Sequence, residues 1–238
     1  MDFPPISAVS FSKLIEFESC KYRTYLSSVV KSPRPEADEN SPLERGTRIH
    51  EGIESYIRSQ ANELPKEVKK PKTTEHIDYV KELFTVGEAS VEEDWGFDKD
   101  WLKTGYYDDN IWLRVKLDAM TMLDEDTAFI TDWKTGKSAG KEVRTMQQGQ
   151  LYCIAAMMRD PKIMTAQPVF AYTDEDKLIK LKPMTRKEMP RYLNRFTSRF
   201  DKITSCVDFT PSPNKMNCMW CPFGPNVGTG ACAHGIEK

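Results

Sequence analysis

Two aspartates and a lysine lie in two adjacent strand-like runs. Asp118 belongs to the run Trp112–Leu123, and Asp132 and Lys134 belong to the run Ala128–Lys134. If the two runs pair as an antiparallel hairpin, the two aspartates are symmetric about its turn, and directly opposed Cβ atoms lie about 5 Å apart. Carboxylates that close repel each other unless a cation lies between them. Lys134 projects from the same strand face as Asp132 and adds an ammonium group. The hairpin therefore predicts a divalent-metal site.

The first run alternates in the way expected of a half-buried strand. One face would carry Leu113, Val115, Leu117 and Ala119, and the other Arg114, Lys116 and Asp118. The remaining elements must hold this hairpin. Periodicity and capping residues predict helices over 11–26 with a break near Cys20, over 43–60, over 77–84 after a cap at Thr74, over 147–158, and from a cap at Thr185 to Ile203. Further strands are predicted over 168–172 and 178–181.

Composition limits the kind of protein this is. The chain has 238 residues, of which 39% are hydrophobic, and can bury the core of one domain. Its 34 basic and 36 acidic residues give a net charge of -2, so attraction to phosphates must be local. No apolar run could span a bilayer, and the N-terminus lacks a basic region followed by an apolar stretch. We therefore expect a cytoplasmic protein without a membrane partner.

An Asp-x-Lys triplet alone is weak evidence, because alternating charges on a strand usually form surface ion pairs. Here the triplet belongs to the block Ile130 to Gly136, and two further blocks accompany it in order: Gly46 to His50 before the hairpin and Gln148 to Tyr152 after it. With Asp118, these blocks resemble the PD-(D/E)XK nuclease superfamily, particularly the RecB-like branch that includes the AddB nuclease domain and the CRISPR-associated exonucleases. The resemblance implies an α/β fold with a central mixed sheet flanked by helices.

The resemblance also implies roles for single residues. His50, Asp118, Asp132 and the backbone carbonyl of Trp133 would bind Mg²⁺ or Mn²⁺, and Lys134 would orient or help deprotonate the attacking water. Asp118, Asp132 and Lys134 are then the catalytic set. DNA would be contacted by Gln148, Tyr152, Lys137 and Arg144. The imidazole favours manganese over magnesium.

Cysteines near both ends predict a second metal centre. Cys218, Cys221 and Cys232 lie in a tail that is poor in periodic structure, and Cys20 lies near the start of the chain. In the resembling family, several members carry one cysteine before the nuclease core and three after it, and bind a 4Fe-4S cluster. A zinc site made of Cys218, Cys221, Cys232 and His234 is the alternative. Cys153 is predicted to be a buried core thiol, and Cys206 is unassigned.

A basic stripe follows the last long helix. Lys187, Arg191, Arg195 and Arg199 recur every four residues, and they form either a solvated face or a track for phosphates. Both interpretations stay open.

The expected protein is a single nuclease domain over 1–238. Its nuclease core covers 43–205, and residues 10–30 join 206–238 in a cysteine-stapled lobe. The expected activity is a metal-dependent DNA exonuclease acting on single strands or duplex ends, in recombination, repair, phage DNA metabolism or spacer acquisition, with recombination, helicase or CRISPR-adaptation proteins as partners. The alternatives are a non-catalytic, cluster-bearing DNA-binding subunit and a structure- or sequence-specific endonuclease of the same superfamily.

Overall fold

A seven-stranded mixed sheet forms the centre of the computed structural model, which describes residues 6–36, 38 and 41–237. Its order is β2-β1-β3-β4-β5-β6, and β7 also pairs with β5. The strands are β1 Ala89–Phe97, β2 Lys103–Thr104, β3 Leu113–Met122, β4 Thr127–Lys134, β5 Thr165–Tyr172, β6 Lys177–Lys180 and β7 Met184–Thr185. β4 and β5 run parallel and the other named pairs are antiparallel. The predicted α/β fold with a mixed sheet is confirmed.

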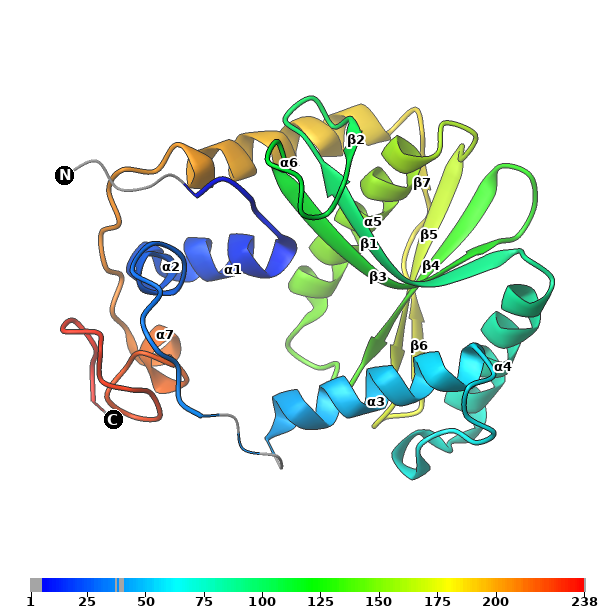
Figure 1. Ribbon diagram of the computed structural model, residues 1–238, viewed down its shortest axis with the longest axis horizontal. Coiled ribbons are helices and arrows are strands. Elements are labelled where there is room, and N and C mark those ends of the chain that lie inside the picture. The colour runs from blue at the N-terminus through cyan, green and yellow to red at the C-terminus, as the bar shows by residue number, and fades with distance from the viewer. Residues whose placement is uncertain (1–5, 37, 39–40, 238) are drawn as a thin grey trace.

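Helices cover both faces of the sheet (Figure 1). They are α1 Phe11–Ser19, α2 Lys21–Thr24, a π-helical turn Tyr25–Val29, α3 Pro42–Ile57, a 3₁₀ turn Lys66–Val68, α4 Pro71–Thr85, α5 Glu142–Arg159, α6 Met189–Thr204 and α7 Lys215–Met219. α3 and α4 lie on one face, whereas α5, α6 and α1 lie on the other. No helix in the described part of the chain has the length and apolar character needed to cross a membrane.

Two hydrophobic cores result from these layers. In the larger core, Leu151 of α5 and Phe200 of α6 pack on the sheet together with Phe11, Leu14 and Phe17 of α1. In the smaller core, the α3 side chains Ile49 and Ile53 and the α4 side chain Ile77 pack against Trp133 and Ala119. α1 therefore packs into the larger core.

The hairpin of β3 and β4 has the predicted register. Ala119 pairs with Thr131 and Met122 with Ala128, so the same register places Asp118 beside Asp132 just beyond the last pair. The predicted alternation fails at one position, however. Leu117 enters the core below α5, but Ala119 enters the core below α3 and α4. β3 therefore turns its face at Asp118.

Two strands that were not predicted, β1 and β2, precede the hairpin. Two local predictions were wrong. Thr74 does not cap α4, which begins at Pro71, where the fixed φ of proline suits the first helical position. Thr185 lies in β7, and its N–H and hydroxyl donate to the Glu188 carboxylate just ahead of α6. The predicted break at Cys20 is confirmed: α1 ends at Ser19, and Cys20 is extended before α2 begins.

The two ends of the chain pack together in a small lobe (Figure 1). Leu26 of the π-helical turn contacts Cys221 and Phe223 in a separate apolar cluster. Asn217 of α7 donates a hydrogen bond of 2.6 Å to the carbonyl of Ser19. Between the π-helical turn and α3, positions 37, 39 and 40 lie outside the described residues. A terminal segment from each end thus builds one lobe beside the sheet.

Candidate active site

The site begins at a break in the sheet. β3 pairs with β4 only from Ala119 onward, whereas β4 continues to Lys134 paired with β5. At the break, the backbone N–H of Trp133 donates to Asp118 Oδ2 at 2.7 Å. The Asp118 carboxylate thus accepts the hydrogen bond that a carbonyl of a neighbouring strand would otherwise accept. This bond holds the carboxylate between the two strands.

Glu92 of β1 faces Asp118 from the other side. The flanking pairs Val91–Ala119 and Glu93–Leu117 fix this register. Glu92 has a φ of 51°, in the left-handed region that non-glycine residues rarely adopt. β1 changes core here as β3 does, since Val91 packs below α3 and Trp95 packs below α5. Both strands therefore turn at the same pair.

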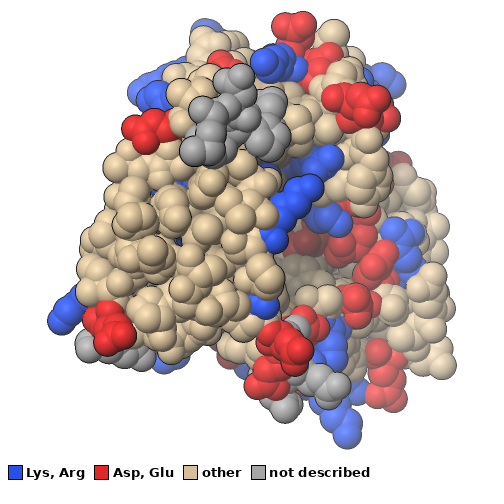
Figure 2. Space-filling model, turned by 60° about the vertical axis from the view of Figure 1, so that its left-hand side comes forward, with Lys and Arg blue, Asp and Glu red and all other residues tan. Residues whose placement is uncertain are grey.

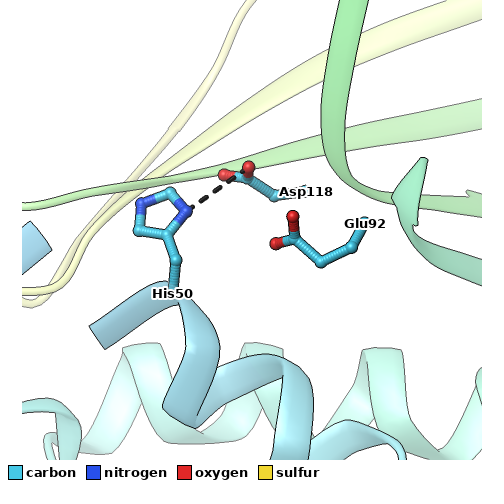
Figure 3. Close-up of side chains that lie close together, drawn as sticks. All are labelled: His50, Glu92 and Asp118. Atoms are coloured by element: carbon cyan, nitrogen blue, oxygen red, sulfur yellow. Dashed lines mark ion pairs between the residues drawn. The ribbon is translucent and has the colours of Figure 1, made fainter. Parts of the chain in front are cut away.

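His50 of α3 completes a group of three potential metal ligands (Figure 3). One donor atom each from His50, Glu92 and Asp118 all lie within 4.8 Å of one another, and His50 Nδ1 is 3.4 Å from Asp118 Oδ1. Ile49 and Ile53 pack α3 against the sheet below this break, and this packing places His50 at the break. Imidazole nitrogen with two carboxylates is a donor set that suits Mn²⁺ or Mg²⁺.

The pKa values in this group reflect crowded negative charge. Burial lowers the pKa of His50, but the hydrogen bond and charge of Asp118, with Asp132 and Glu92, outweigh it and raise this pKa to about 9. Burial, Asp118 and Glu54 raise the pKa of Glu92 to about 7, against the weaker effects of His50 and Lys116. The crowded negative charge thus favours the protonated forms of His50 and Glu92.

Asp132 is the centre of an adjoining cluster. Its side chain is almost fully buried and its Oδ1 accepts hydrogen bonds from the Tyr152 hydroxyl at 2.7 Å and the Gln148 amide at 3.2 Å. Its Oδ2 lies 2.6 Å from Lys134 Nζ, yet accepts no hydrogen bond of good angle from the described residues. Burial raises the pKa of Asp132, Lys134 opposes this, and Asp118 adds to it.

The structure thus brings the predicted residues into two neighbouring clusters. Asp118 joins His50 in one cluster, and Asp132, Lys134, Gln148 and Tyr152 form the other. Trp133 links them through its N–H. Sequence reasoning missed Glu92, which lies among three consecutive acidic residues that hide the period of β1. Tyr152 is only 6% exposed, and its hydroxyl donates a hydrogen bond to Asp132, so it is placed to orient that carboxylate.

A cleft of about 690 Å³ opens at Lys134, Gln148 and Tyr152. Among the residues that the structure describes, its charged lining residues are all basic: Arg114, Lys116, Lys134, Lys141 and Arg144. Figure 2 shows this side of the molecule, hollowed, with basic and acidic side chains meeting in the hollow. Arg144 thus lies where a DNA contact was predicted, whereas Lys137 is exposed and does not line the cleft.

Two other surface features fit a polyanion less well. A larger open hollow of about 900 Å³ beside α3 and α4 is lined by four acidic residues, Glu63, Glu75, Asp78 and Glu82, and by two lysines, Lys69 and Lys70, so acidic charge is in excess there and disfavours phosphate. On α6, Arg199 donates to both carboxylate oxygens of Glu18, at 2.7 and 2.6 Å, and so ties α6 to α1. None of the four basic residues of that stripe lines the cleft described above.

The four cysteines predicted to share a metal line one small cavity in the terminal lobe, together with His234. All are free thiols. Burial raises the pKa of Cys232; the backbone N–H of His234 opposes this, and Cys221, Cys20 and Cys218 raise it further. Within the described chain, no three of these donor atoms lie within 4.8 Å of one another.

The other two cysteines lie outside this cavity. Cys153 is fully buried in α5, as predicted, and its thiol donates to the carbonyl of Ala166 at 3.3 Å. Burial raises the pKa of Cys153 to about 12, which makes it inert. The thiol of Cys206 donates to the carbonyl of Asp208.

Known proteins share this architecture. A family model for the PD-(D/E)XK nuclease superfamily matches residues 8–225. The crystal structure of SSO0001 is similar at a TM-score of 0.51 and 14% identity, over 99% of this chain and 91% of that one. A crystal structure from Eubacterium rectale, described as that of a candidate exonuclease, has a TM-score of 0.50 and 11% identity, over 90% of this chain and 86% of its own. A comparison with curated proteins found no matching sequence.

Proposed function

Because the chain belongs to the PD-(D/E)XK nuclease superfamily, we propose that it is a divalent-metal-dependent deoxyribonuclease that degrades DNA from the ends of single strands or duplexes. One observation carries the proposal. Three potential metal ligands lie within 4.8 Å of one another beside a buried aspartate–lysine pair, at the edge of a cleft whose charged lining is entirely basic.

The residues fit a divalent cation. His50, Glu92 and Asp118 offer one nitrogen and two carboxylate donors, and Asp132 Oδ2 is a buried oxygen without a well-formed hydrogen bond. The Lys134 ammonium, 2.6 Å from this oxygen, already compensates part of its charge, so the fit to a divalent cation rests on the three ligands. A bound Mg²⁺ or Mn²⁺ would polarise the phosphate and lower the pKa of a water molecule. The carbonyl of Trp133 is a further proposed ligand.

The remaining roles belong to side chains of the chain itself. Lys134 holds its ammonium 2.6 Å from Asp132 and also lines the cleft, so it can orient a water and stabilise charge on a phosphate. Tyr152 and Gln148 fix the Asp132 carboxylate by hydrogen bonds. Arg144 and Lys141, both lining the cleft, would contact the phosphates of the strand. Lys137, outside the cleft lining, would do so only on DNA that extends beyond it.

In the terminal lobe we propose a 4Fe-4S cluster bound by Cys20, Cys218, Cys221 and Cys232. Four thiols from both ends of the chain converge on one cavity, which matches the one-before, three-after arrangement of the cysteines in cluster-binding members of the resembling family. The cluster would tie the N-terminal segment to the tail. Recombination, repair and phage DNA metabolism are the processes we propose for such an enzyme, with helicase or recombination proteins as partners.

The deciding experiment compares end-labelled DNA incubated with Mn²⁺ and wild-type protein, Asp118→Asn, Lys134→Met and the surface control Lys162→Ala. Asparagine retains an oxygen to accept the N–H of Trp133, so loss of activity in Asp118→Asn would reflect lost charge rather than misfolding. We expect the control to match wild type and both site variants to lose at least about a hundredfold of the rate. Equal activity of all four proteins would overturn the proposal.

Two substrates separate the alternatives. An exonuclease leaves closed circular DNA intact while digesting the linear form, whereas an endonuclease of the same superfamily cuts both. Wild-type protein that binds DNA but cleaves neither substrate with Mn²⁺ or Mg²⁺ would instead be a non-catalytic DNA-binding subunit.

A further inference from the structure

A tyrosine pair lies at the mouth of the basic cleft, on the loop between β2 and β3. Tyr106 lines the cleft together with Arg114 and Lys116. Its neighbour Tyr107 is 83% exposed. A large aromatic side chain that is this exposed leaves apolar surface in contact with water beside a polar site. These rings take no part in the metal group or in the cluster around Asp132.

The loop that carries the tyrosines is held in a fixed shape. The Asp108 carboxylate accepts hydrogen bonds from the Thr104 hydroxyl at 2.8 Å and the Gly105 N–H at 2.7 Å. Arg114 Nε donates to the carbonyl of Tyr106 at 2.9 Å. On β1, a Cβ at Gly96 would lie 2.6 Å from the carbonyl oxygen of Gly105, so only glycine admits this close approach. The rings are therefore presented by a preorganised loop, which reduces the entropy lost when a ligand binds.

Cations surround the same rings. The Tyr106 and Tyr107 centroids are 5.1 Å apart with the rings at 76°. The Arg114 guanidinium lies 5.4 Å from the Tyr106 centroid and 6.0 Å from the Tyr107 centroid, and Lys116 Nζ lies 5.5 Å from that of Tyr106. Exposed aromatic rings combined with a groove of positive charge are the pattern by which proteins hold single-stranded nucleic acid.

We propose that Tyr106 and Tyr107 form a stacking platform for an unpaired nucleobase of the DNA strand that enters the cleft, while Arg114 and Lys116 contact its phosphates. This inference rests on the proposed function and deepens it, because it selects the substrate. Bases inside a duplex are stacked on one another and cannot meet a protein ring, so the platform favours single strands and frayed ends. Tyr107 offers the exposed ring on which a base can stack. Tyr106 packs against Tyr107 and lines the same cleft as Lys134.

The test measures binding without cleavage, using the Asp118→Asn protein in chelator. The probes are an oligothymidine, the same oligomer with one abasic nucleotide at successive positions, and a blunt duplex. In this background we compare four proteins: the Asp118→Asn protein with its tyrosine loop unchanged, and the same protein carrying Tyr107→Ala, Tyr107→Trp or the control Tyr79→Ala. The control alters a tyrosine of α4 outside the cleft. We expect Tyr107→Ala to weaken oligothymidine binding on the order of tenfold, and Tyr107→Trp and the control to leave it unchanged.

Position dependence provides the second readout. One abasic position should weaken binding to the unchanged loop and have no further effect on Tyr107→Ala, because both changes remove the same stacked pair. Two results together would overturn the platform: Tyr107→Ala binds oligothymidine as tightly as the protein with the unchanged loop, and no abasic position weakens the binding of either protein. Those results leave the nuclease proposal standing if wild type still digests DNA with Mn²⁺. Conversely, a base-sensitive strand site in a protein that cleaves nothing would support the platform and refute the nuclease.

Discussion

Glu92 lies directly opposite Asp118 across the β1–β3 pair, and both strands change the core into which they pack at this position. The left-handed backbone of Glu92 accompanies the turn. A residue in this conformation costs about 1–3 kcal/mol, and such residues cluster at functional sites. The turn brings two carboxylates to His50 at the point where β3 separates from β4.

Replacing Glu92 with glutamine should make the stability of the metal-free protein less dependent on pH between about 5 and about 7. The pKa of Glu92 is about 7 in the fold against an ordinary 4.5, so the folded protein holds this proton more tightly than the unfolded chain. The free energy of unfolding that this proton contributes is fully present below pH 4.5 and is lost as the pH rises through the folded pKa of about 7. Between about pH 5 and about pH 7, the melting temperature should fall less in Glu92→Gln than in wild type.

The same variant should lose part of the stabilisation that Mn²⁺ gives, because a ligand that binds only the folded state raises the melting temperature more when it binds more tightly. Glu93→Gln, the adjacent carboxylate that accepts a hydrogen bond from Trp95, is the matched control. An unchanged Mn²⁺ shift in Glu92→Gln would remove Glu92 from the ligand set.

Removing the hydroxyl of Tyr152 should reduce turnover without abolishing binding. Tyr152→Phe leaves the buried ring in place but takes the 2.7 Å hydrogen bond from Asp132. Groups that orient metal-site carboxylates typically contribute about 10–100-fold to activity. We expect a fall of kcat of that size with KM nearly unchanged. Tyr56→Phe removes a tyrosine–aspartate hydrogen bond of the same 2.7 Å length, to Asp78, and should have no effect. Equal kcat values in the two variants would contradict the positioning role.

The cleft and the α6 stripe make different predictions for DNA binding. Arg144 lines the cleft, whereas Arg195 is an exposed residue of α6 outside it. Arg144→Ala should weaken single-strand binding and lower the slope of log affinity against log salt by about 0.7, the value for one lost phosphate contact. Arg195→Ala should change neither quantity. Titrations at several salt concentrations measure both, and the reverse pattern would identify the stripe as the phosphate track.

Replacing Cys20 should release the N-terminal segment from the tail. A wild-type preparation with a 4Fe-4S cluster is brown, and we expect Cys20→Ser to lose the visible absorption and to be cut by protease between residues 206 and 215. Cys206→Ser, whose thiol lies outside the cavity, should keep the colour. A colourless wild type with one zinc per chain would refute the cluster.

Local patterns in the sequence determined much of this protein. The alternation of apolar and polar residues and the symmetry of positions 118 and 132 about Glu125 predicted the β3–β4 register. They could do so because successive side chains of a strand point to opposite faces of the sheet. Helical periodicity found α3 and α5, which hold His50, Gln148 and Tyr152. The cysteine spacing indicated which four thiols would converge.

Tertiary structure alone decided how distant residues combine. Glu92 joins the site through pairing with a strand 26 positions away, and no period within β1 reports that partner. Tyr152 orients Asp132 because α5 packs against β5 so closely that a Cβ on Gly149 would meet Pro168 at 2.8 Å. Arg199 is neutralised by Glu18 from α1, and Tyr106 reaches the cleft because its loop folds over β1. A sequence records what each residue prefers locally, but the burial and charge around a side chain depend on segments that only the fold brings together.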